Sequence, residues 1–138
     1  MGAPISSRSV NETKLEALVE TMYLAARADG ELTAEERTHF VSSVQSLTDS
    51  RLEGDTLRVL LERFESVYQK SGRQECLQSV KARLGEARSC HLALSMAIGM
   101  LASDGVLRTA EREFILELAD TLGIDRGSTD DLVKEIAG

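Results

Sequence analysis

Apolar residues recur every three or four positions along almost the whole chain, which is the spacing of one face of an α-helix. In the first such segment Leu15, Leu18, Met22 and Ala26 share a face. Pro occurs once, and Val and Ile are not gathered in strand-like runs. This pattern predicts an all-α fold. The length of 138 residues suits one domain with a single core.

Glycines and capping residues divide this pattern into about seven helices joined by short links. The expected helices are residues 11–28, a segment that begins at Thr33, residues 54–70, a segment that ends at Gly85, residues 87–103, a segment that ends at Gly123, and a short last helix capped by Ser128 or Thr129. Residues 92–102 carry no charge, and a helix that is apolar on every side is typical of the centre of a bundle. We therefore predict a compact bundle in which residues 92–102 are the most buried stretch.

The charge of the chain restricts its partners. Acidic residues outnumber basic ones by 23 to 16, and the net charge is −7. Such a surface repels phosphate, so we expect no nucleic acid and no anionic lipid surface as partner. Cations and basic protein partners fit it better. Residues 1–9 are expected to be a flexible tail ahead of a domain that spans residues 10–138.

The cysteines and the hydropathy indicate where such a chain works. Cys76 and Cys90 are too few for a disulfide framework. The chain has no apolar run of the length that a membrane helix needs. We therefore expect a cytoplasmic protein that does not insert directly into a membrane.

One motif occurs twice, at an offset of 75 residues. Residues 29–37 align without gaps with residues 104–112, and the two copies share Asp, Gly, Leu, Glu and Arg. Each copy lies at a predicted junction between two helices. The simplest architecture is therefore a pair of pseudo-symmetric helical hairpins.

The acids of this repeat are the candidate functional residues. Asp29, Glu36, Asp104 and Glu111 lie three, four, seven or eight positions from apolar residues of the predicted inner faces. All four carboxylates are therefore expected to project toward the interior. A buried carboxylate costs several kcal/mol unless a partner compensates it.

Three kinds of partner could compensate these acids. The protein itself could do so, through free N–H groups at the next helix start and through Arg37 or Arg112. A divalent cation such as Ca²⁺ or Mg²⁺ could bind between the carboxylates. A basic protein partner could dock against them. The residues leave these three alternatives open.

The duplicated Asp-Gly-x-Leu-x-x-x-Glu junction, in an Ala- and Leu-rich helical chain, resembles the TerB-like family of tellurite resistance. The best-matching stretches are Ala25–Leu47 and Leu101–Gly123, and the likeness in helix order extends from about residue 10 onward. The resemblance implies an α-helical domain with inverted halves. It also implies a cytoplasmic accessory or stress-response role, exercised through protein partners that can be membrane-associated.

The resemblance further implies a metal site. Carried over to this sequence, the acidic cluster of the family falls on Asp29, Glu36, Asp104 and Glu111. The second copy is less acidic, because Val106 and Ala110 stand where the first copy has Glu31 and Glu35. The first copy is therefore the favoured site, with Glu31 and Glu35 as possible extra ligands.

No pattern in the sequence indicates an enzyme. Cys76, Cys90 and His91 lack the spacing of zinc ligands, and no serine or cysteine has a visible base partner. His39 aligns with Phe114 in the repeat, which predicts a packing role. We predict a non-enzymatic accessory module that can bind a divalent cation and needs no other cofactor. The alternatives are a protein-interaction adaptor whose buried acids are structural, and a metal-dependent hydrolase.

Overall fold

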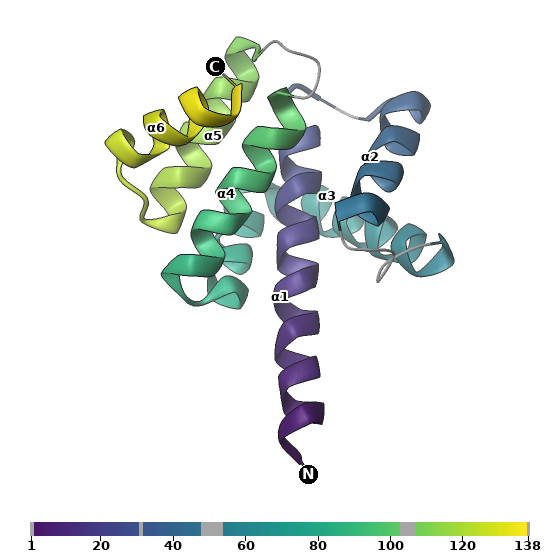
Figure 1. Cartoon of the computed structure of the whole chain (residues 1–138). Helices are drawn as coiled ribbons and strands as arrows, with labels where there is room; N and C mark the ends of the chain where they lie inside the picture. The colour runs from purple at the N-terminus through teal and green to yellow at the C-terminus, as the bar shows by residue number, and fades with distance from the viewer. Residues whose placement is uncertain (1, 31, 48–53, 103–106, 138) are drawn as a thin grey trace.

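The computed structural model describes residues 2–30, 32–47, 54–102 and 107–137, and within these ranges it describes the side chains from residue 13 onward except that of Leu47. The described residues form six α-helices and no strand. The helices are α1 Gly2–Ala26, α2 Ala34–Leu47, α3 Gly54–Leu84, α4 Ala87–Leu101, α5 Thr109–Leu122 and α6 Arg126–Ala137. Helices α2, α3, α4 and α5 pack around the second half of α1, and α6 packs against α4 and α5 (Figure 1). This arrangement confirms the prediction of a compact all-α bundle.

The difference between seven predicted helices and six observed ones lies in α3. This element covers both segments that the sequence placed between residue 54 and Gly85. Gly72 interrupts it with φ 83° and ψ 171°, a conformation that glycine adopts without a steric penalty. The predicted break near Gly72 is therefore present as a kink inside one element.

The first and last helices begin earlier than the sequence suggested. Helical backbone in α1 includes residues 2–9, where a flexible tail was expected, and these turns project beyond the other helices (Figure 1). Helix α6 is capped by Asp125 and not by Ser128 or Thr129. The backbone N–H of Ser128 donates to Oδ1 of Asp125 over 2.7 Å, and this bond lowers the pKa of Asp125.

The most buried stretch is in α1, so the prediction for residues 92–102 is wrong. Every residue from Val19 to Ala25 is buried, because α1 contacts α2, α3, α4 and α5. Helix α4 packs against α1, α5 and α6, and its buried residues include Leu94, Ala97 and Ile98. Leu92, on its other side, is 49% exposed. The uncharged outer face of α4 is therefore not a core surface.

A buried ion pair joins α1 to α3. Only 4% of Glu20 is exposed, and its carboxylate accepts a hydrogen bond from the guanidinium of Arg83. The apolar pattern of α1 would place Glu20 on an outer, solvated face. Because neighbouring helices cover α1 on several sides, that face is inside the bundle, and Arg83 supplies the compensating charge.

Candidate functional site

Both repeated glutamates act as caps at the start of a helix. Oε1 of Glu36 accepts the backbone N–H of Thr33 over 2.8 Å, and Oγ1 of Thr33 accepts the backbone N–H of Glu36 over 3.1 Å. Oε1 of Glu111 accepts the backbone N–H of Arg108, also over 2.8 Å. The two contacts occupy equivalent positions of the repeat. For these two acids the structure confirms that the protein itself is a partner.

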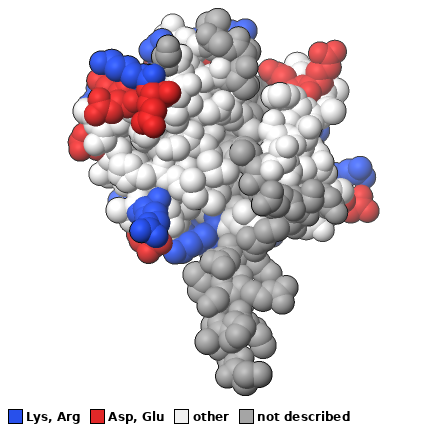
Figure 2. Space-filling model, in the orientation of Figure 1, with Lys and Arg blue, Asp and Glu red and all other residues white. Residues whose placement is uncertain are grey.

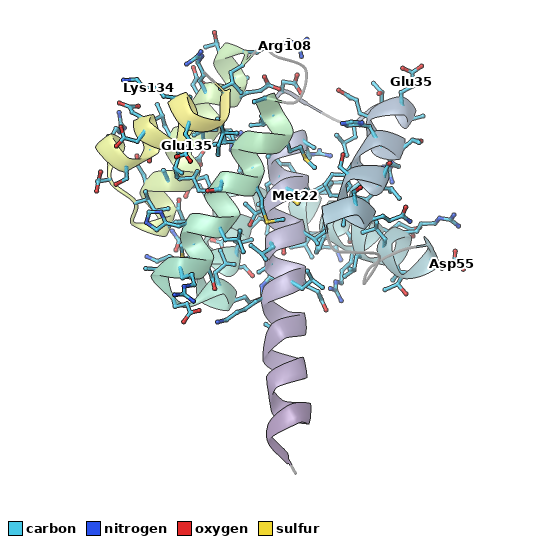
Figure 3. All side chains as sticks on the ribbon, viewed as in Figure 1. Met22, Glu35, Asp55, Arg108, Lys134 and Glu135 are labelled. Atoms are coloured by element: carbon cyan, nitrogen blue, oxygen red, sulfur yellow. The ribbon has the colours of Figure 1, made fainter. Side chains whose placement is uncertain are left out.

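The two junctions converge on one pocket, which we call the junction pocket. It has a volume of about 480 Å³. Its polar lining consists of Asp29, Glu35, Glu36 and His39 from the first junction, and Arg108 and Glu111 from the second. Glu35 and Arg108 lie at the same end of the molecule (Figure 3). The repeat therefore builds one shared pocket from its described residues, whereas the sequence favoured a site at the first copy alone. Glu31 and Asp104 lie outside the described residues.

The predicted inward direction holds for only one of the three acids that can be checked. Glu111 is buried, with 8% exposed, whereas Asp29 and Glu36 are exposed. Asp29 follows the last residue of α1, so helical periodicity no longer determines its direction. Glu36 lies in the first turn of α2, which the other helices cover only in part. Helical spacing from apolar residues therefore predicted the wrong side-chain direction for both acids.

The cation of the junction pocket is an arginine that the sequence analysis missed. Nη1 of Arg108 lies 3.6 Å from Oδ2 of Asp29, which links the second junction to the first. Arg37, one of the two arginines expected here, instead pairs with Glu65 of α3. Arg112, the other, lines a different pocket beside α6. Arg108 stands where the first copy has Thr33. This additional positive charge in the second copy was the sequence feature that could have identified Arg108 as the cation of the site.

The remaining candidates take other positions. His39 is exposed and lines the junction pocket, so the predicted packing role is wrong. Cys76 and Cys90 are buried, and burial raises the pKa of both thiols, which keeps them protonated at neutral pH.

No three His, Cys, Asp or Glu side chains in the described part of the chain are grouped closely enough to hold a metal ion. Metal binding therefore stays a prediction.

No described helix combines the length and the apolar character that crossing a membrane requires.

Comparison with known proteins gave one family. A family model described as tellurite resistance protein TerB matches residues 15–133, a span that includes both junctions and all the helices in whole or in part. No curated protein and no solved structure gave a significant match.

Proposed function

The chain belongs to the TerB family of tellurite resistance proteins, and from that premise we propose that it is a non-enzymatic accessory module that binds a protein partner in the cytoplasm. The proposal places partner recognition at the junction pocket. A partner with a lysine or arginine would meet carboxylates from both halves of the repeat there.

The state of the pocket acids supports this proposal. Glu36 and Glu111 are held by backbone N–H groups, and Asp29 faces Arg108 at 3.6 Å. The positions of the two glutamates are therefore set by the protein before any partner arrives, and a pre-organised site loses less entropy on binding. Four carboxylates against one guanidinium give the pocket an excess of negative charge. A positive group of a partner would gain from that excess.

Charge reversal at Glu35 tests the proposed function. Glu35 is exposed in the first turn of α2 and lines the pocket, so Glu35→Lys changes the pocket charge without disturbing the core. In cells that lack their own copy of the protein, we expect wild type to restore growth on tellurite and Glu35→Lys to restore little of it. Growth on tellurite and melting temperature are measured together. Glu62→Lys, an exposed position on α3, is the matched control and should restore growth fully.

Binding of Ca²⁺ or Mg²⁺ in the junction pocket is a second candidate function. The observation that favours it is that Asp29, Glu35, Glu36 and Glu111 line one pocket, because hard cations prefer carboxylate oxygens. No three of these side chains are grouped closely enough to hold an ion as they stand, so a bound cation would have to draw them together. Arg108 would compete with a bound cation, because it pairs with Asp29. Removing the arginine charge should therefore strengthen cation binding.

The cation candidate predicts a stability change that urea unfolding can measure. For Arg108→Gln, a cation at a hundred times its Kd should raise the free energy of unfolding by about 2.7 kcal/mol relative to chelator. Wild type should gain less at the same concentration, and adding Glu36→Gln to the variant should reduce the gain. The amide of Gln still caps the helix start. Identical unfolding curves with cation and with chelator, in wild type and in Arg108→Gln, would exclude this candidate.

A further inference from the structure

A second cavity adjoins the junction pocket. It lies between α2 and α4, and Ile136 of α6 also lines it. It has a volume of about 630 Å³ and shares His39 and Met100 with the junction pocket. We call this cavity the α2–α4 groove. Figure 1 shows α2 standing apart from α4, and Figure 2 shows uncharged side chains over this face, with charged groups toward its edges. Groove and pocket adjoin at these two residues, and we refer to the two together as the depression.

The side chains that α2 contributes to this depression are acidic at one end and uncharged at the other. Glu35 and Glu36 line its first part, His39 lies where the two cavities meet, and serines line the rest as far as Ser46. These residues recur at the spacing of one helix face. From Glu35 to Ser46 the face is about 16 Å long, at roughly 1.5 Å per residue. This length matches about three turns of a docked helix.

The α4 side has a shape that suits a bulky apolar partner. Ser95 and Gly99 are one turn apart and leave space, while Met96 and Met100, also one turn apart, supply flexible apolar surface. An added Cβ at Gly99 would meet no heavy atom within 4 Å, so open space lies above this part of the helix. Methionine side chains adapt readily to the shape of a partner.

We propose that the α2–α4 groove binds an amphipathic helix of another protein, with the apolar face of that helix against Met96 and Met100 and its lysine or arginine residues at the acidic end beside Glu35 and Glu36. The inference rests on the proposed function, because it names the class of partner that the junction pocket recognises. The negative charge of Glu35 and Glu36 at one end of the depression favours a partner with positive side chains at that end. A second copy of the chain fits less well, because its own net charge is −7.

Two synthetic probes test the proposal. Each is a fluorescein-labelled peptide of about three to four turns, held helical by a side-chain cross-link because short helices are unstable in isolation. Both carry leucines along one face, and one has lysines at one end where the other has glutamates. Fluorescence anisotropy should show that the lysine probe binds the full chain about ten-fold or more tightly than the glutamate probe.

Variants assign that binding to the groove. Gly99→Leu places a side chain in the open space, and leucine is more favourable than glycine in a helix, so the fold is retained. We expect Gly99→Leu to weaken binding of the lysine probe by about ten-fold or more. Gly99→Ala, which adds only a methyl group, should bind nearly as wild type does. Glu35→Lys should weaken the lysine probe and strengthen the glutamate probe, while Glu62→Lys should change neither.

Four outcomes would overturn the proposal. The first is that neither probe binds at millimolar concentration, and the second is that both probes bind with equal affinity. The third is an unchanged Kd for the lysine probe in Gly99→Leu. The fourth is self-association in sedimentation that Gly99→Leu abolishes, because this result would identify a second copy of the chain as the occupant. The two proposals can fail separately. Full growth of Glu35→Lys on tellurite, with the groove effects present, would contradict only the proposed function.

Discussion

Replacing Arg83 with methionine is expected to lower the free energy of unfolding by about 3 kcal/mol. The side chain of Glu20 is 6% exposed, and Arg83 is the cation that pairs with it. Methionine keeps much of the aliphatic volume of Arg83 but leaves the buried carboxylate without a compensating charge. The midpoint of urea unfolding, read with the slope of the transition, measures this loss.

Two further variants separate the charge effect from a packing effect. Arg58→Met removes an arginine of the same helix, whose partner Asp55 is 92% exposed, and it should cost less than about 1 kcal/mol. The double variant Glu20→Met/Arg83→Met removes both charges and should recover most of the lost stability. Equal losses in Arg83→Met and Arg58→Met would show that the α1–α3 ion pair is not a buried interaction.

The same ion pair reverses an order of effects that the sequence suggested. Apolar periodicity alone places Glu20 on the solvated side of the first helix and Asp29 inside, so it predicts that Asp29→Ala is the more costly change. In the structure Glu20 is buried and Asp29 is exposed. Glu20→Ala should therefore destabilise the protein more than Asp29→Ala does.

Truncation of Leu94 to alanine should cost about 2–5 kcal/mol, because this residue has no exposed surface and packs in the main core. The change removes apolar contacts within this core and leaves a cavity. Leu92→Ala is the matched control on the same helix, since Leu92 is 49% exposed. It should change stability by less than about half a kcal/mol. Similar losses for the two variants, measured by urea unfolding, would contradict the assignment of a buried and an open face to α4.

Some features of the site were accessible from the sequence because they depend on local interactions. A glutamate at the third position of a helix can accept the backbone N–H of the residue three positions before it, and the repeat places such a glutamate at each junction. The Glu36–Thr33 and Glu111–Arg108 contacts were therefore predictable before any tertiary packing was known. The convergence of the two junctions on one pocket was not predictable in this way, because it depends on how α1, α2, α4 and α5 pack together. The Arg108–Asp29 pair spans the two repeat copies for the same reason.

The sequence by itself determined the helical class, the segments that become helices and the glycine that interrupts α3, because periodicity and backbone preference act within a few residues. Tertiary structure alone decided which sides of those helices meet. The uncharged run in α4 predicts a helix buried on every side. One of its faces instead lines an open groove, because α2 does not cover that face. Glu20 reads as a surface acid, yet α3 covers it and supplies Arg83. Burial depends on neighbours that are distant in the chain, and no local pattern specifies them.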